Sequence, residues 1–385
     1  MTRHFRVSSC DTPFHGTKQL RWKGATAVRT RSSSWLLLIV VALALGACGG
    51  TDDEEGEGAA QATTATETSK AAGAAPDAKA DCANVKGDAE GARIAYMPPA
   101  TEFPYYIAIG EGIKTKAKEI GYKTFMLAPQ SGADIEGQMG MIQDVLTQDV
   151  DAIILSTHDE KAAAPLVKRA VNKGVAVIIV NSDIADFPTP VHGVVGYRQR
   201  PGTHKIGEYA IDLVDGEATI GIIEGQPGYH STERVGGFVD AIKPEDGMEI
   251  VASQPGAWNV EGGNKTAMDM LQAHPDIDMI FAANDYMAIG ADQAAKALGK
   301  DDLIILGNDG DTQALEEIYA GDWTATVNTT PFEMGERVLE VAQDCLGKQF
   351  DGFYVETPTE VVDKENALEF LQQPERLYPK PSKEY

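Results

Sequence analysis

The chain has 385 residues, 43% of them hydrophobic, so it can bury more than one core, because single cores stop growing at about 250–300 residues. Its 58 acidic residues outnumber 33 basic ones and give a formal net charge of -25, which repels nucleic acid and anionic lipid surfaces. The 4 cysteines include no Cys-x-x-Cys pair and no zinc-like spacing, so neither a disulfide scaffold nor a metal site is indicated.

The first feature along the chain is an apolar run at residues 35–45, preceded by arginines and ending in Leu45-Gly46-Ala47-Cys48. This layout is typical of a signal peptide, and the run is short for the alternative of an uncleaved membrane anchor. The ending resembles the bacterial lipobox, which implies cleavage before Cys48 and lipidation of its thiol. We therefore expect residues 1–47 to be lost, Cys10 included. The remainder would lie outside the cytoplasm, bound to the membrane by the lipid anchor alone.

The next segment is rich in Gly, Ala, Thr, Asp and Glu and has almost no large apolar residue up to about residue 80, so it cannot form a core. We expect a disordered acidic tether over residues 48–90, which holds the folded body off the membrane. Cys82 and Cys345 would share an oxidising compartment and can pair there. The sequence leaves their separation, and hence the disulfide, open.

From residue 93 onward, short β-branched runs alternate with segments of helical period. The predicted strands are residues 93–97, 123–127, 152–155, 175–180, 219–223, 249–253, 279–282, 303–306 and 325–327. Most are near-continuous apolar runs, which are typical of parallel strands covered on both faces. Alternation with helices predicts βαβ units. Because the pattern occurs before and again after about residue 196, we expect two doubly wound α/β lobes.

Polar and aromatic residues gather where these strands end, which is where open α/β sheets bind ligands. The stretches are 103–106, 156–159, 181–183, 229–234, 258–259, 284–285, 308–310 and 328–329. Asp, Asn and Arg supply the donors and acceptors that sugar hydroxyls need, and aromatic planes pack against the C–H face of a sugar ring. The set predicts a cleft for a sugar or sugar alcohol.

Several of these residues also fit simpler roles, which the sequence leaves open. Asp285 begins a predicted helix and serves equally well as its N-cap, in which case Asn284 is the better candidate for a ligand contact. Asp309 in Asn-Asp-Gly fits a turn. Trp258 and the Tyr105-Tyr106 pair fit core or surface packing, and Arg234 fits a solvated helix charge or a structural ion pair. All of them nevertheless fall at the same end of their predicted sheets.

Motifs over about residues 91–370 resemble the ribose-binding-protein branch of the type I periplasmic binding proteins. The matching stretches include 104–106, 233–238, 253–258, 273–276, 281–290 and 307–310. The resemblance implies two lobes joined by three crossover strands: residues 91–196 plus 330–359, and residues 197–329 plus 360–370, with a tail at 371–385. It also implies a monomer that needs no cofactor or metal and delivers a small sugar or polyol to an ABC permease.

The resemblance further implies the site residues. By matching position, Tyr105 and Tyr106 form an aromatic sandwich, Trp258 the opposing wall, Arg234 the hydroxyl-binding arginine, Asn284 the amide contact and Asp309 the carboxylate contact, with Ser156 and Thr329 as further polar contacts. The chain departs from the family where Asn181-Ser182 replaces Asp-Arg and where Phe103 replaces Asn. Asn181 remains a predicted contact, and Asp183 can partly replace the missing carboxylate. The departures favour a polyol, a deoxy sugar or a less polar ligand over ribose.

Other functions have less support. Ser156, His158 and Asp159 are the residue types of a nucleophilic triad, but no Gly-x-Ser-x-Gly elbow and no Gly-rich phosphate loop occur, so we expect neither an enzyme nor a nucleotide cofactor. A transcription repressor would need a basic helix-turn-helix where the acidic tether lies. A sensor coupled to a chemoreceptor, or a binder of a non-sugar molecule, would use the same cleft, and the sequence leaves both open.

Overall fold

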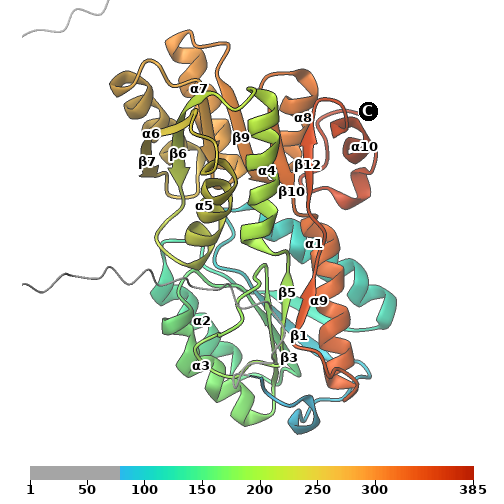
Figure 1. Ribbon diagram of the computed structural model, residues 1–385. Coiled ribbons are helices and arrows are strands. Elements are labelled where there is room, and N and C mark those ends of the chain that lie inside the picture. The colour runs from blue at the N-terminus through green and yellow to red at the C-terminus, as the bar shows by residue number, and fades with distance from the viewer. Residues whose placement is uncertain (1–78) are drawn as a thin grey trace, which may run out of the picture. The chain divides into compact units, whose positions relative to one another are not determined.

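The structure is a computed structural model and describes residues 79–385. The predicted signal peptide, the lipidation site Cys48 and the tether up to residue 78 lie outside the described residues. Within residues 79–385 the chain forms two six-stranded sheets, each with helices on both faces (Figure 1). The predicted class of two wound α/β lobes is confirmed.

The sheet of the first lobe, here the N-lobe, has the strand order β11-β5-β4-β3-β1-β2 and is parallel throughout. Its strands are β1 (Arg93–Met97), β2 (Lys123–Met126), β3 (Ala152–Leu155), β4 (Ala176–Val180), β5 (Gly193–Gly196) and β11 (Tyr354–Glu356). Helices α1 (Pro104–Ile120) and α9 (Pro331–Leu346) pack on one face, and α2 (Ile135–Val145) and α3 (Glu160–Lys173) pack on the other. Burial on both faces explains why β1, β3 and β4 are continuous apolar runs.

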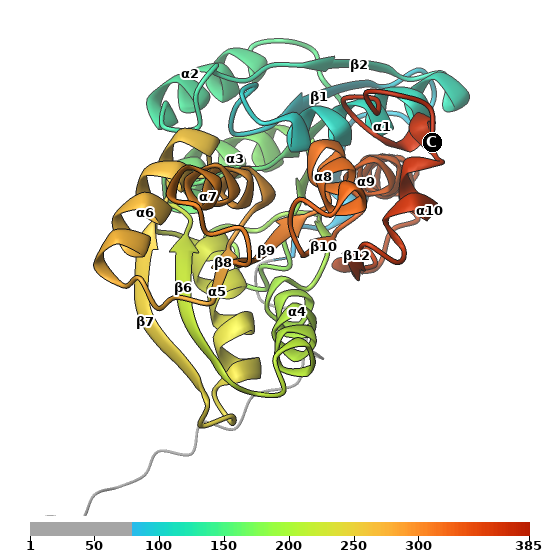
Figure 2. The same cartoon turned by 90° about the horizontal axis from the view of Figure 1, so that it is seen from above.

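The sheet of the second lobe, here the C-lobe, has the order β12-β10-β9-β8-β6-β7. Its strands are β6 (Ala218–Glu224), β7 (Met248–Pro255), β8 (Met279–Ala282), β9 (Ile304–Asp309), β10 (Ala325–Asn328) and β12 (Glu360–Asp363). Helices α4 (Gln199–Leu213) and α5 (Tyr229–Ile242) lie side by side on one face (Figure 2). Helices α6 (Val260–Ala273), α7 (Asp285–Leu298) and α8 (Thr312–Ala320) cover the other, and α10 (Ala367–Leu371) packs on α8.

The chain passes between the lobes three times, after β5, after β10 and between β11 and β12. The pattern of apolar runs did not predict β5, β11 or β12 as strands, because β5 (GVVG) is two valines between glycines and β11 (YVE) and β12 (EVVD) contain acidic residues. Both sheets are parallel except at one edge of the C-lobe sheet, where β12 runs antiparallel to β10. The short link from β11 returns the chain directly into the C-lobe, with no crossover helix to reverse its direction.

Helix ends follow local sequence and fix where the loops begin. Asp134 and Asp159 cap α2 and α3 by accepting hydrogen bonds from the backbone N–H groups of Gly137 and Ala162. Helix α1 begins with Pro104, whose missing N–H costs nothing in a first turn, and ends at Gly121 with a left-handed φ of 77°. These boundaries place residues 98–103 and 156–159 in loops at the carboxyl ends of β1 and β3.

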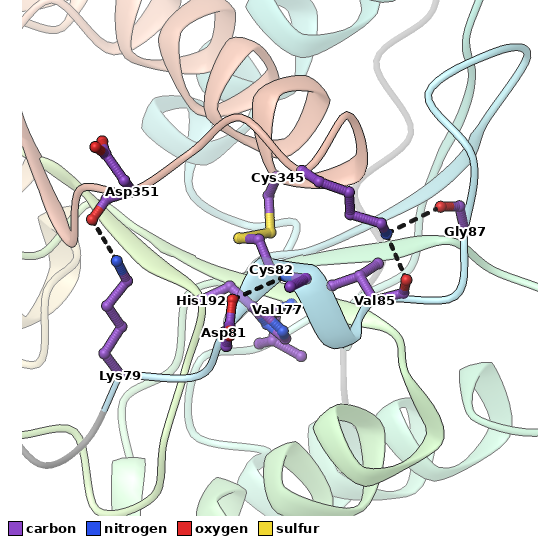
Figure 3. Close-up of a disulfide and its surroundings, with 11 residues drawn as sticks. Lys79, Asp81, Cys82, Val85, Gly87, Val177, His192, Cys345 and Asp351 are labelled. Atoms are coloured by element: carbon purple, nitrogen blue, oxygen red, sulfur yellow. Dashed lines mark hydrogen bonds between the residues drawn. A yellow bond between two sulfur atoms is a disulfide. The ribbon is translucent and has the colours of Figure 1, made fainter.

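The described chain begins with a segment fastened to the N-lobe (Figure 3). Ala80 N–H donates to the Val191 carbonyl at 2.8 Å. Cys82, in a short 3-10 helix (Cys82–Asn84), forms a disulfide with Cys345 of α9, with the two Cα atoms 5.1 Å apart. Residues 79–86, expected as the end of the tether, are therefore held against the lobe. Residues 79–385 contain no helix long and apolar enough to cross a membrane.

Candidate functional site

Loops from both lobes line one cavity. Its lining residues are Phe103, Tyr105, Tyr106, His158 and Asn181 from the N-lobe and His230, Arg234, Trp258, Asn284, Tyr286 and Asp309 from the C-lobe. They follow β1, β3 and β4 in one sheet and β6, β7, β8 and β9 in the other. The structure thus brings seven of the ten predicted ligand contacts together at the carboxyl ends of both sheets.

The N-lobe wall of the cavity is aromatic and internally hydrogen-bonded. The Tyr105 hydroxyl lies 3.0 Å from Asn181 Oδ1, to which it donates, and 2.9 Å from Thr329 Oγ1. The Tyr106 hydroxyl accepts from Asn181 Nδ2 at 3.2 Å and from Ser156 Oγ at 3.3 Å. Burial raises the pKa of both tyrosines, so both are neutral. This wall carries no charge.

The two tyrosine rings do not form parallel plates. Their centroids are 5.5 Å apart and their planes meet at 88°, so they make a corner rather than the sandwich that the resemblance implied. Both residues lie in the first turn of α1, directly after Pro104. Successive helical residues diverge by about 100°, which keeps neighbouring rings from stacking. The corner presents one ring face and one ring edge.

Three predicted contacts lie outside the lining. Ser156 and Thr329 sit behind the tyrosines and hold their hydroxyls. Asp183 accepts from the Tyr229 hydroxyl at 3.0 Å and from Gln199 N–H at 3.2 Å, both in the C-lobe. The chain turns at the end of β4 because Asn181 has a left-handed φ of 59°, and Asp183 lies beyond that turn. Asp183 therefore joins the lobes instead of replacing the missing carboxylate.

The C-lobe wall is built on a buried ion pair. Arg234 Nη1 lies 2.9 Å from Asp309 Oδ1, and each side chain is only 5% exposed. The guanidinium also donates to the Ala283 carbonyl at 3.0 Å and lies 5.4 Å from the centre of the Trp258 ring. Burial raises the pKa of Asp309 to about 6, and Arg234 opposes that rise. A paired charge in a buried site is a strong partner for ligand hydroxyls.

Asn284 lines the cavity as expected, but it, and not Asp285, caps α7. Asn284 is the N-cap of α7, since its Oδ1 accepts from Met287 N–H at 2.9 Å, while its Nδ2 donates to the Trp258 carbonyl at 3.1 Å. Asp285 is not the cap. It is fully buried and accepts from the backbone N–H groups of Gly310 and Asp311, at 2.8 Å each. Asp285 therefore organises the turn that presents Asp309.

Four lining residues were not predicted as ligand contacts: Phe103, His158, His230 and Tyr286. All four belong to stretches already noted at strand ends or follow them directly, and that position was the available signal. The triad suggested by Ser156, His158 and Asp159 does not assemble. Ser156 donates to Tyr106, and Asp159 caps α3. Among residues 79–385, no cluster of three His, Cys, Asp or Glu side chains is placed to hold a metal ion.

A cavity between two wound lobes, with aromatic walls and a buried Arg–Asp pair, defines the class of two-lobed solute-binding proteins. Residues 94–349 match the periplasmic binding protein domain model, and the chain belongs to that family. The resemblance seen in the sequence is thereby confirmed. Members of this family work outside the cytoplasm.

The similar proteins agree with this assignment. The D-ribose/D-allose-binding protein of Pseudomonas aeruginosa is 30% identical over 286 residues, covering 70% of this chain and 88% of that protein. A crystal structure from Actinobacillus succinogenes with bound D-allose superposes with a TM-score of 0.68 at 26% identity, covering 72% of this chain and 99% of that one. A Bacillus halodurans solute-binding protein with bound myo-inositol gives a TM-score of 0.67 at 25% identity, with 74% and 99% covered.

Proposed function

We propose that this protein is the extracytoplasmic solute-binding component of an ABC transporter. It captures a sugar or sugar alcohol between its lobes and delivers it to a permease. The observation that carries the proposal is that Arg234, Asp309 and Trp258 of one lobe face Tyr105 and Tyr106 of the other across a single cavity. Its relatives and structural neighbours bind D-ribose, D-allose and myo-inositol.

The chemistry of the cavity suits a small polyol. Arg234 keeps N–H donors beyond those bound to Asp309 and Ala283, because a guanidinium carries five. The Trp258 ring and the tyrosine corner offer surfaces for C–H groups. With Asn181 and Ser182 in place of a carboxylate and a guanidinium, the N-lobe favours a ligand with a less polar face.

Ligand contacts fall into two groups in this proposal. Those that touch the ligand are Tyr105, Tyr106, Asn181, Arg234, Trp258, Asn284 and Asp309. Ser156 and Thr329 act by holding the tyrosine hydroxyls, and Asp183 acts by joining the lobes through Tyr229. The cycle is one of binding and release without covalent chemistry, so the protein is not an enzyme.

The working cycle is a hinged closure. The lobes open and close about the three links, with residues 91–196 and 330–359 moving against residues 197–329 and 360–370. A ligand favours closure only by the contacts that it gains in the closed state. A monomer closed on its ligand then docks on the permease. We also propose export as a lipoprotein, cleaved before Cys48 and held at the membrane by lipid on that residue.

The direct test is isothermal titration calorimetry of the purified protein with D-ribose, D-allose and myo-inositol. We expect at least one of them to bind. Replacing Trp258 with Ala removes a cavity wall and should weaken that binding by about twofold to tenfold, since aromatic contacts beyond area burial are worth about 0.5–1.5 kcal/mol. Tyr378→Ala is the control, because that ring is exposed in the C-terminal segment. Binding of none of the three, or equal binding by the Trp258 variant, would count against the proposal.

A further inference from the structure

Two histidines line the cavity from opposite lobes. His158 lies in the loop after β3 of the N-lobe, and His230 lies in the first turn of α5 of the C-lobe. Both also line a neighbouring hollow, together with Gly228 and Trp258. The two rings therefore share one edge of the site, where the lobes meet. The hydrogen bonds that each ring makes to the protein decide which of its two nitrogens carries the proton. They therefore decide whether the other face of the ring can donate to a ligand or accept from it.

The His158 ring is fixed by the N-lobe. Its Nδ1 lies 3.3 Å from the Gly132 carbonyl, and its plane packs edge-on to the Phe103 ring at 5.9 Å. A carbonyl only accepts, so Nδ1 carries the proton. Burial lowers the pKa of His158, and the hydrogen bond to Gly132 opposes this effect in part. Arg234 lowers the pKa further and Glu102 raises it, both by smaller amounts. The neutral ring then has an unprotonated Nε2, which is an acceptor.

The His230 ring is fixed by a chain of side chains in the C-lobe. Arg234 Nε can only donate, so the atom of Gln199 that it meets at 3.3 Å is the amide oxygen. His230 Nδ1 lies 2.8 Å from the Gln199 amide nitrogen and 3.1 Å from the amide oxygen. The nitrogen is the nearer atom, and the oxygen already accepts from Arg234, so we assign the amide nitrogen as the donor to Nδ1. Burial, with Arg234 and His158 adding to it, lowers the pKa of His230. With Nδ1 as the acceptor, the neutral ring carries its proton on Nε2, which is a donor.

We propose that His158 and His230 form a specificity-determining pair in which Nε2 of His158 accepts a hydrogen bond from a ligand hydroxyl and Nε2–H of His230 donates one to it. A hydroxyl donates and accepts through the same oxygen, whereas an ammonium group only donates and a carboxylate only accepts. In the described part of the chain, neither Nε2 has a hydrogen-bond partner of its own. The inference rests on the proposed function and narrows it to hydroxyl-bearing, uncharged ligand groups at this edge.

The pair also links ligand binding to closure. Each ring is held only by its own lobe, through Gly132 and Phe103 on one side and through Gln199 on the other. A hydroxyl bonded to both rings therefore bridges the lobes. Protonation of His158 would turn its Nε2 from an acceptor into a donor, so that the ligand hydroxyl would face two donors. Arg234 and Glu102 are the charged groups that face this ring, and Arg234 faces His230.

Calorimetry on matched variants at pH 7.5 tests the pair, with D-allose, D-ribose and myo-inositol as probes. His158→Phe and His230→Phe keep the ring volume but remove the nitrogens, and each should weaken binding about tenfold or more. His158→Gln and His230→Gln restore an amide oxygen or nitrogen near the Nε2 position and should recover most of the affinity. His204→Gln is the control, because His204 is exposed on α4 beside Glu208, and its affinity should equal that of the wild type.

Nitrogen-15 NMR of histidine-labelled full-length protein provides a second measurement, which needs no ligand. We expect Nδ1–H for His158 and Nε2–H for His230 at pH 7.5, assigned with the Gln variants. Reversed tautomers, or Phe variants that bind as the wild type does, would overturn the pair while wild-type binding still supported the proposed function. Failure of the wild type to bind any of the three probes would contradict the proposed function, and the hydroxyl site with it.

Discussion

The two walls of the cavity occupy the same position in two similar lobes but differ in chemistry. The N-lobe wall is neutral, and its tyrosine hydroxyls are already bonded to Asn181, Ser156 and Thr329. The C-lobe wall holds a buried ion pair between Arg234 and Asp309. The difference indicates that the C-lobe supplies the charged contacts, while the N-lobe supplies shape and neutral hydrogen-bonding groups. A ligand that needs charged partners on both sides would not match this cavity.

The largest effect should come from the charged wall. Arg234→Ala leaves Asp309 buried without its partner, which costs about 3–5 kcal/mol for a buried pair. We expect sugar binding to fall more than a hundredfold and urea stability to drop. Arg200→Ala is the matched control. Its ion pair with Asp240 is 40% and 47% exposed, and such pairs contribute about 0–1 kcal/mol. If both variants lost the same affinity and stability, the buried Arg234–Asp309 pair would contribute no more than an exposed ion pair.

The next largest effect should come from removing the disulfide of the N-lobe. The Cys82–Cys345 disulfide closes a loop of 263 residues in sequence, and loss of a native disulfide typically costs about 2–5 kcal/mol. Cys82→Ala with Cys345→Ala should therefore lower the free energy of unfolding by that amount. Sugar affinity should stay close to wild type, because neither cysteine lines the cavity. An unchanged urea midpoint would show that the disulfide does not stabilise the N-lobe.

Acid should destabilise the N-lobe through His192. This ring is 1% exposed and accepts from Val177 N–H at 2.9 Å, and burial lowers its pKa to about 4. The unfolded chain takes up a proton below about pH 6.5, but the folded protein does not until about pH 4. Its contribution to stability is complete above pH 6.5 and is lost as pH falls to 4, by up to about 3 kcal/mol.

His192→Asn keeps an acceptor near Nδ1 without titrating, so urea unfolding of this variant should depend less on pH between 6.5 and 4. In the C-lobe, Asp285 makes stability depend on pH in the opposite direction, because burial raises its pKa to about 7. Its folded form holds a proton that the unfolded carboxyl loses near pH 4, so this contribution is lost as pH rises from 4 to 7. If the His192→Asn protein keeps the full acid sensitivity, His192 is excluded as the cause.

The smallest effect should come from the neutral wall. Tyr105→Phe removes the hydroxyl that bonds Asn181 and Thr329, and a typical hydrogen bond contributes about 0.5–1.5 kcal/mol. We expect calorimetry to show a loss of affinity of a few-fold, with the ring still in place as a wall. Tyr378→Phe, at an exposed ring, is the control. A loss as large as that of Arg234→Ala would mean that the two walls contribute equally.

The sequence predicted the fold because its signals were local and repeated. Strands β1, β3 and β8 match the predicted limits, since apolar runs of four or five residues are too short for helices and fit buried strands. The sequence pattern did not predict β11 and β12 as strands, because YVE and EVVD are short and partly polar. Their pairing with β5 and β10 depends on contacts between distant parts of the chain. Only the family resemblance indicated that the chain crosses between lobes there.

The sequence predicted which residues line the cavity better than it predicted what each of them does there. Strand-end position identified Arg234, Trp258 and Asp309, all of which line the cavity. It could not tell which of Asn284 and Asp285 caps α7, because either side chain can accept from the first turn. It also placed Asp183 in the cavity, since the left-handed turn at Asn181 leaves no mark in the sequence beyond an Asn.

The most direct test of the central claim is a crystal structure of the protein with the sugar or polyol that binds it most tightly. The account predicts one ligand between the lobes, with hydroxyls on Arg234 and Asp309 and a ring face against Trp258. It also predicts that Tyr105 and Tyr106 keep their bonds to Asn181. Ligand density outside this cavity, or charged groups of the N-lobe drawn in to bind it, would contradict the account.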